Sequence, residues 1–173
     1  MRFDTQAADL YVDNNTASVL ARPAPAGDYA VDVEMTLDVP AEGCCQNFVQ
    51  GGFVLRSGGA DADDRFVKLV HASIFETRQT EWAKEVPEAP AEYPRYGNGV
   101  VGPPGDVTTL RIVVDRRPGE DRFTAWTRQD DRAWVRGGTW THELGEDAEI
   151  GLVSMGGAGF TTRFLDVTTR RVR

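Results

Sequence analysis

Residues 29–39 read YAVDVEMTLDV, and this stretch decides the fold class. Apolar side chains occupy every second position from Tyr29 to Val39, whereas mostly polar side chains fill the positions between them. Successive side chains of a β-strand point to opposite faces of the sheet, so a period of two predicts a strand with one buried face. We therefore expect a half-buried strand over residues 29–39.

Seven other stretches have β-like character, and each is bounded by glycine, proline, aspartate or asparagine. They cover residues 47–56, 65–74, 77–86, 108–115, 122–128, 149–155 and 160–169. No window repeats apolar residues at helical spacing over three turns, so no major helix is expected. Eight or more antiparallel strands need a second layer, because one open sheet would leave its apolar face in water. The sequence predicts an all-β fold, a two-sheet antiparallel β-sandwich, as one domain over residues 1–173.

The charge pattern narrows the class of partner. A net charge of −8 without any lysine- or arginine-rich run argues against nucleic acid, whose binding depends on clustered cations. No stretch approaches the ~20 apolar residues that cross a bilayer, and residues 1–4 lack the apolar core of a signal peptide.

Cys44 and Cys45 are neighbours, so a bond between them would close a strained ring, and we interpret them as ordinary thiols. We expect no nucleic-acid or membrane partner, and the compartment stays open.

One connection is much longer than a hairpin turn. Residues 87–105 read PEAPAEYPRYGNGVVGPPG, which is rich in proline and glycine. Long loops on a rigid scaffold often carry function. Tyr93 and Tyr96 lie on this loop, where they could project toward a ligand or act as a loop latch.

Five segments, taken in order, resemble the concanavalin A-like domain found at the C-terminus of family 43 β-xylosidases and arabinofuranosidases. They cover residues 9–38, 50–69, 77–85, 108–140 and 150–172, with the signatures PAPAGDY, GGFVLR, DDRFVKL, WAKE and IGLVS. The resemblance implies a jelly roll without a catalytic apparatus of its own, which either binds polysaccharide or packs against a glycosidase domain. The opening strand looks shorter than in that family and the 87–105 loop longer, so the binding surface is expected to differ in detail.

Sugar recognition needs flat aromatic faces for C–H groups and planar polar groups for pairs of hydroxyls. In residues 122–128, Phe123 and Ala125 are expected to face the core, which places Trp126 on the other face with Thr124 and Arg128 as a sugar platform. Trp82 and Trp134 are expected to pack in the core. The aromatic candidates for sugar binding are thus Trp126, Trp140, Tyr93 and Tyr96.

A polar cluster is the second candidate feature. His71, Arg78, Glu81 and Lys84 come from consecutive predicted strands and would converge on hydroxyl groups if their faces are shared. Solvated charge pairs across the strands explain them equally well.

Catalytic motifs are absent from the sequence. Neither His71 nor His142 lies beside a G-x-S-x-G motif, and there is no E-x-D-x-x-E strand of the kind that pairs glycosidase carboxylates. Glu34, Glu81 and Glu85 could still pair across a sheet, so enzyme activity remains open.

A structural calcium ion is the metal that the sequence could bind. Its ligands would be Asp61, Asp63 and Asp64, which lie close together in the sequence. A solvated acidic turn explains these three residues as well, and Asp9 and Asp166 near the two ends are alternative ligands. No other cofactor is expected.

Three hypotheses follow for function. The first is a non-catalytic module that binds a polysaccharide or oligosaccharide beside a glycoside hydrolase, through its concave sheet face and the 87–105 loop. The second is a structural sandwich that packs on a catalytic domain without touching sugar. The third is a standalone glycosidase or lyase of concanavalin-like fold.

Overall fold

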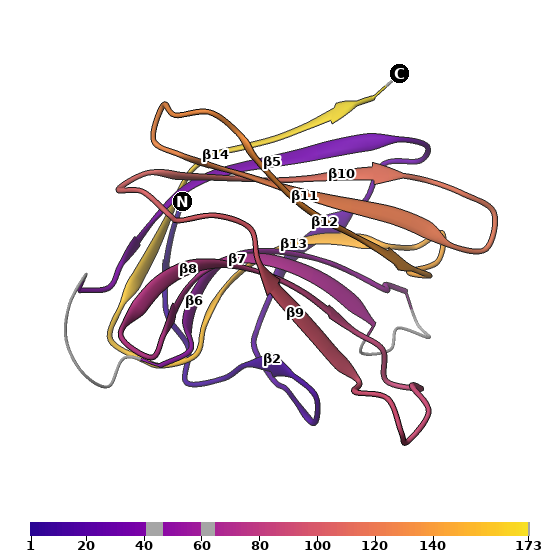
Figure 1. Cartoon of the computed structure of the whole chain (residues 1–173), viewed down its shortest axis with the longest axis horizontal. Helices are drawn as coiled ribbons and strands as arrows, with labels where there is room; N and C mark the ends of the chain where they lie inside the picture. Colours follow the sequence, from indigo (N-terminus) through magenta and orange to yellow (C-terminus); the bar gives the residue numbers. More distant parts are fainter. Residues whose placement is uncertain (41–46, 60–64, 173) are drawn as a thin grey trace.

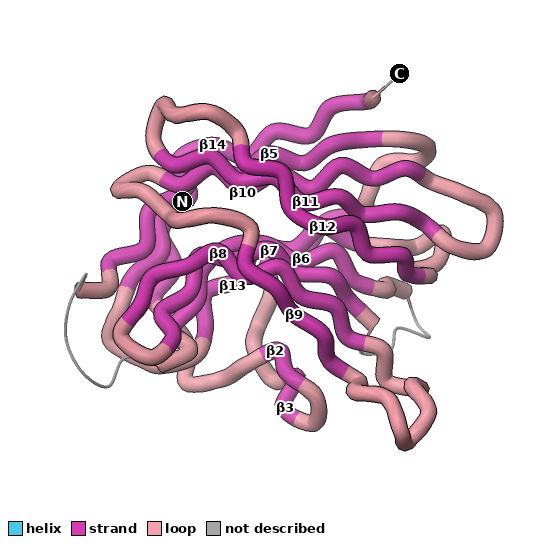
Figure 2. The backbone as a smooth tube through the Cα atoms, in the orientation of Figure 1, coloured by secondary structure: helices cyan, strands magenta, loops and turns pink. Residues whose placement is uncertain are grey.

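The fold consists of two six-stranded antiparallel sheets packed face to face (Figures 1 and 2). It is a computed structural model that describes residues 1–40, 47–59 and 65–172, and none of these residues is helical. The described part contains no helix able to cross a membrane. The predicted all-β, two-sheet sandwich is therefore confirmed.

The first sheet, which we call the β5 sheet, has the strand order β1–β14–β5–β10–β11–β12. Its strands are Arg2–Asp4, Thr161–Arg171, Tyr29–Asp38, Thr108–Asp115, Asp121–Gln129 and Val135–His142, in that order.

The second sheet, the β7 sheet, has the order β4–β13–β6–β7–β8–β9. Its strands are Leu20–Pro23, Glu149–Met155, Val49–Arg56, Phe66–Ile74, Thr77–Glu85 and Tyr96–Val100. A small hairpin of β2 (Leu10–Tyr11) and β3 (Asn14–Asn15) lies outside both sheets.

The alternation in residues 29–39 produces β5 for the expected reason. Tyr29, Val31 and Val33 face the space between the sheets and are buried, whereas Asp32 and Glu34 on the other side are partly exposed. All eight predicted strands are present, with ends within two residues of those expected. The 87–105 connection differs from the prediction, because β9 occupies its second half and pairs with β8.

The main core lies between the two sheets. Phe53, Leu69 and Trp82 reach it from the β7 sheet, and Ile112 and Phe123 reach it from the β5 sheet. The predicted core position of Trp82 is confirmed, with 2% of the residue exposed.

A second apolar cluster lies on the outer face of the β7 sheet. Val54, Phe66 and Val70 form its base, and Leu10 and Ala17 of the N-terminal segment cover it. Figure 1 shows the β7 sheet arching over β2, so this outer face is the concave one. The N-terminal segment therefore covers part of the concave face.

The interior side of β7 also holds an ionisable side chain. His71 is two positions from the core residue Leu69, pairs with Thr80 on β8 and is 5% exposed. Neither ring nitrogen has a hydrogen-bond partner among the described residues. Burial, and then the positive charge of Arg78, lower the pKa of His71 from 6.5 to about 4. The imidazole is therefore neutral in the folded protein at neutral pH.

The first prediction concerns two glycines with similar backbone angles. Gly156 (φ +86°) has no room for a side chain, since a Cβ there would lie 1.6 Å from the Phe48 carbonyl oxygen, whereas Gly145 (φ +78°) has open space. Gly145→Ala should cost about 1 kcal/mol for the positive φ alone. Gly156→Ala should cost about 3 kcal/mol, because overpacking adds to the same backbone cost. Urea denaturation of both variants measures the difference, and equal losses would contradict the crowding described here.

The second prediction concerns acid stability. Unfolded His71 takes up a proton near pH 6.5 but folded His71 only near pH 4, so the stability contributed by the neutral ring is present above pH 6.5 and is lost as the pH falls toward 4. Between pH 7 and pH 5 this linkage amounts to about 2 kcal/mol. His71→Phe should remove this part of the pH dependence of the unfolding free energy. Identical pH dependences for wild type and variant would show that the His71 pKa is not depressed.

Candidate functional site

A hollow opens on the concave face of the β7 sheet, beside the β2–β3 hairpin. Its volume is about 430 Å³. It is lined by Asp9, Tyr11, Phe48, Gln50, Lys68, Ile74, Glu81, Tyr96 and Asn98. These residues come from the N-terminal segment and from β6, β7, β8 and β9 or the loops next to them, so the hollow exists only in the folded sandwich.

Lys68 forms the floor of the hollow. It is 1% exposed, and its Nζ donates hydrogen bonds to the Leu10 carbonyl oxygen at 3.1 Å and to Gln50 Oε1 at 3.0 Å. The ammonium also lies 5.3 Å from the centroid of the Tyr96 ring. Burial lowers the pKa of Lys68, while the nearby carboxylates of Glu81, Asp9 and Glu85 act in the opposite direction. Lys68 thus ties the N-terminal segment to β6.

Glu81 is the central carboxylate. Its Oε1 accepts hydrogen bonds from the Tyr96 hydroxyl and, at 3.4 Å, from Asn98 Nδ2. Burial and the negative charge of Glu81 raise the pKa of Tyr96 far above its usual range, so this hydroxyl stays protonated and donates. Within the described part of the chain, Glu81 Oε2 accepts no hydrogen bond. One oxygen of a positioned carboxylate is thus left for a ligand.

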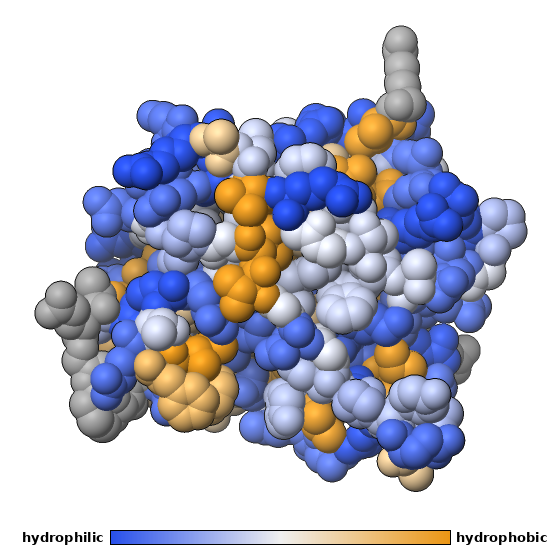
Figure 3. All heavy atoms as spheres, in the orientation of Figure 1, coloured by the Kyte–Doolittle hydropathy of each residue, from blue (hydrophilic) through white to orange (hydrophobic). Residues whose placement is uncertain are grey.

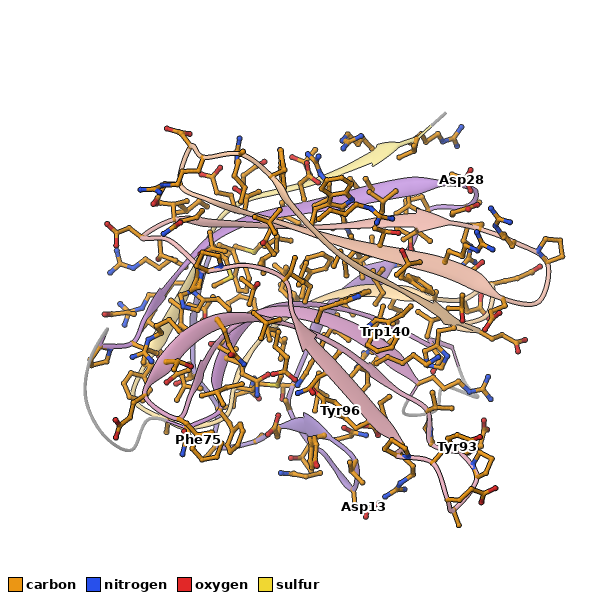
Figure 4. The ribbon with its side chains drawn as sticks, in the orientation of Figure 1. Asp13, Asp28, Phe75, Tyr93, Tyr96 and Trp140 are labelled. Atoms are coloured by element: carbon orange, nitrogen blue, oxygen red, sulfur yellow. The ribbon has the colours of Figure 1, made fainter. Side chains whose placement is uncertain are left out.

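Glu85 holds the hairpin that borders the hollow. Its carboxylate accepts hydrogen bonds from the Val12 amide at 2.6 Å and from Asn15 Nδ2 at 2.8 Å. At the hairpin tip, the exposed Asp13 pairs with Arg95 at 2.7 Å, and the Tyr11 ring meets Tyr96 edge to face, with centroids 4.8 Å apart. Figure 4 shows Tyr96 next to the hairpin that carries Asp13. These contacts give one wall of the hollow a defined position.

The structure divides the predicted polar cluster between two faces. Glu81 lies on the concave face, whereas Arg78 and Lys84 share the opposite face of β8 with the core residue Trp82. Arg78 donates to Ser73 Oγ at 2.7 Å and Lys84 to the Thr141 carbonyl oxygen at 2.6 Å. His71 also faces the interior, so these four residues do not converge.

The predicted aromatic platform lies on the other side of the sandwich. Trp126 and Arg128 are on the outer face of the β5 sheet, opposite to the core residues Phe123 and Ala125 as expected. Trp134 was expected in the core but stacks on this outer face, under the guanidinium of Arg111 at 4.0 Å from the ring centroid. Cation–π stacking with Arg111, and with Arg128 at 5.2 Å, replaces core burial for this indole.

The other two aromatic candidates also lie away from the hollow. Trp140 is partly buried against the main core and pairs with Phe123 across the strands, and Figure 4 places it between the sheets. Tyr93 is 65% exposed in the β8–β9 connection. Of the four predicted aromatic residues, only Tyr96 lines the hollow.

The predicted calcium ligands Asp61, Asp63 and Asp64 lie outside the described residues. Residues 1–40, 47–59 and 65–172 contain no group of three histidine, cysteine or acidic side chains that could hold a metal ion. The calcium site stays a prediction.

The carboxylates considered for catalysis are spread out. Glu34 lies on the β5 sheet, and Glu81 and Glu85 are four residues apart on β8. Glu85 is also engaged elsewhere, because its carboxylate accepts hydrogen bonds from the Val12 amide and from Asn15 Nδ2 of the hairpin. Asp9 shares the hollow with Glu81 and was not considered for catalysis from the sequence.

Sequence reasoning also missed Gln50 and Lys68. The signal was a lysine inside the apolar run 65–74, at a position that alternation assigns to the same face as Phe66 and Val70. A charged side chain on such a face requires partners, and here they come from Gln50 and from the N-terminal segment.

Comparison with known proteins supports the fold. No protein-family model matches the sequence, and no curated protein matches it. A functionally unknown protein from Saccharomyces cerevisiae has a similar structure, with a TM-score of 0.68 at 10% identity, covering 99% of this chain and 88% of that chain.

Two other solved structures also have a similar fold. A bifunctional GH43-CE protein of Bacteroides eggerthii matches with a TM-score of 0.68 at 12% identity, covering 98% of this chain but 22% of its own. The exoplasmic/lumenal domain of VIP36, in its Ca²⁺/Man3GlcNAc-bound form, matches with a TM-score of 0.52 at 11% identity, covering 88% of this chain and 71% of its own. The chain therefore has the concanavalin A-like sandwich fold expected from its resemblance to the C-terminal domains of family 43 enzymes.

Proposed function

We propose that this protein is a non-catalytic carbohydrate-binding domain that holds a neutral oligosaccharide in the hollow of the β7 sheet. The observation that carries the proposal is the lining of the hollow, where two carboxylates, two amides and two tyrosines converge on one concave surface. As in other ligand sites, a few positioned polar groups would fix the orientation of the ligand and aromatic rings would supply contact area.

The polar groups are held in place before any ligand arrives. Gln50 is oriented by the hydrogen bond from Lys68, which occupies its Oε1 and leaves its Nε2 to donate. Glu81 is oriented by Tyr96 and Asn98, which leaves Oε2 to accept. The planar donor lies on β6 and the planar acceptor on β8, with β7 between them, so each can hydrogen-bond a different hydroxyl of a bound sugar. Such preorganisation reduces the entropy lost on binding.

The charges around the hollow favour a neutral sugar over an acidic one. Asp9, Glu81 and Glu85 all act on Lys68, so three carboxylates surround a single ammonium group. Lys68 is buried and already donates to two oxygens. A uronic acid would therefore meet a negative field, which costs free energy at close range.

The structural neighbours support an association with sugars. One of them was solved with Man3GlcNAc bound, and another is a GH43-CE protein, so the fold is compatible with both sugar binding and attachment to a hydrolase. Because one sandwich fold hosts many activities, the fold alone does not specify binding, and the polar lining of the hollow does. We further propose that the partner of this domain is a glycoside hydrolase catalytic domain, which the bound oligosaccharide brings close to its substrate.

The third prediction tests the site with a conservative change. Glu81→Gln keeps the shape of the side chain but removes the charge from the hydrogen bond to a sugar hydroxyl, a bond worth about 1.5–3 kcal/mol when charged. Calorimetric titration with neutral xylo-, arabino-, gluco- and manno-oligosaccharides should show at least about tenfold weaker binding by this variant for the sugar that binds. Glu34→Gln, on the outer face of the β5 sheet, is the matched control and should bind like the wild type.

The same titrations separate the competing hypotheses. Binding without release of reducing ends supports the proposal. If the wild type binds none of the neutral glycans, the proposal is refuted. That result would favour a sandwich that packs on a catalytic domain without binding sugar. Release of reducing ends that is lost in Glu81→Gln would identify an enzyme instead.

A further inference from the structure

Two exposed phenylalanines stand at one end of the hollow. Phe48, which precedes β6, is 46% exposed, and Phe75, which follows β7, is 73% exposed. Their rings meet edge to face with centroids 6.1 Å apart. Figure 3 shows an orange patch at lower left, in the region where Figure 4 labels Phe75. We call this pair the Phe48–Phe75 platform.

The backbone of the platform is strained. Phe48 has a φ of 65°, and Phe75 and Glu76 have φ values of 45° and 66°. Left-handed backbone costs a residue with a Cβ roughly 1–2 kcal/mol. Phe75 and Glu76 form the two-residue turn between β7 and β8, where Asn-Gly would adopt the same angles at lower cost. The strained backbone lowers the stability of the fold and exposes an aromatic ring. Strained backbone of this kind is typical of functional sites.

Several contacts hold the platform in place. The Phe48 amide donates to the Ser73 carbonyl oxygen at 2.6 Å, and the Phe75 amide donates to Asn47 Oδ1 at 2.5 Å. Gly156 packs directly under the Phe48 carbonyl, where no side chain would fit. Two segments that are distant in sequence thus fix the backbone that carries both rings, which reduces the entropy lost when a ring stacks on a ligand.

The platform continues the surface of the hollow. Phe48 and Ile74 belong to its lining, and Phe75 is the next residue after Ile74. Glu81 lies opposite Val70 of β7, and from Val70 to Ile74 the concave face follows β7 for four residues, about 13 Å. A single sugar ring at Glu81 would leave the platform empty, whereas an oligosaccharide chain would reach it.

We infer that the Phe48–Phe75 platform is a second subsite, on which a further ring of the same neutral oligosaccharide stacks its C–H face. The inference rests on the proposed function and specifies the ligand: a chain of pyranose units with a flat apolar face, rather than a single sugar. The polar groups at Glu81 select the sugar, and the platform adds affinity for longer chains.

The fourth prediction separates the platform from the hollow. Phe75→Asn removes the ring but keeps a residue that tolerates left-handed backbone, so the turn is retained and the thermal midpoint should equal or exceed that of the wild type. Calorimetry with a ladder from disaccharide to hexasaccharide should show wild-type affinity increasing with length. In Phe75→Asn the hexasaccharide should bind about fivefold more weakly, while the disaccharide changes less than twofold.

Tyr93→Ala is the matched control, since it removes a ring of similar exposure outside the hollow and should bind every oligosaccharide like the wild type. Equal hexasaccharide affinity in Phe75→Asn and wild type would overturn the second subsite while leaving the proposed function intact. If the wild type binds no member of the ladder, the proposed function fails and the subsite fails with it.

Discussion

The concave face depends on the burial of one ammonium group. Lys68 lies on the outer side of a sheet, where an amine would normally reach water, yet it is covered by the N-terminal segment and held by Leu10 and Gln50. An unpaired charge in this position would cost several kcal/mol, so the segment and the amide have to be in place together. The same arrangement shapes the hollow, because the segment that covers Lys68 also contributes Asp9 and Tyr11 to its wall.

The two outer faces of the sandwich differ in chemistry. On the β5 sheet, arginines stack on Trp126 and Trp134, and Arg111 forms two hydrogen bonds with Asp32, so the polar and aromatic groups satisfy one another. On the β7 sheet, the hydrogen-bonded groups converge on open space and leave donors and acceptors for another molecule. On the outer face of the β5 sheet these groups contact one another, whereas the concave face of the β7 sheet leaves groups for a ligand.

Much of the fold was predictable, since buried strands carry their own signal. The period-two pattern of residues 29–39 predicted β5. On β8, odd and even positions point to opposite faces, so the core residue Trp82 assigns Arg78 and Lys84 to the inner face and Glu81 to the outer face. The strands that escaped prediction are β1–β4, β9 and β12, most of which are short and largely exposed, so they show no alternation. The site was harder to predict because it is assembled across long distances. Lys68 and Leu10 are 58 positions apart, and no local sequence pattern predicts that they are in contact.

The termini place a constraint on the order of folding. β1 pairs with β14, Gln6 donates to the Ser154 carbonyl oxygen, and the Gly156 amide donates to the Ala8 carbonyl oxygen. The first strand and the segment that walls the hollow must therefore wait until residues 154–163 have been synthesised. Contacts of such long sequence separation make folding slow, because loop-closure entropy is lost before they form. The hollow is thus among the last parts of this sandwich to form, and a nascent chain lacks it until β13 and β14 have left the ribosome.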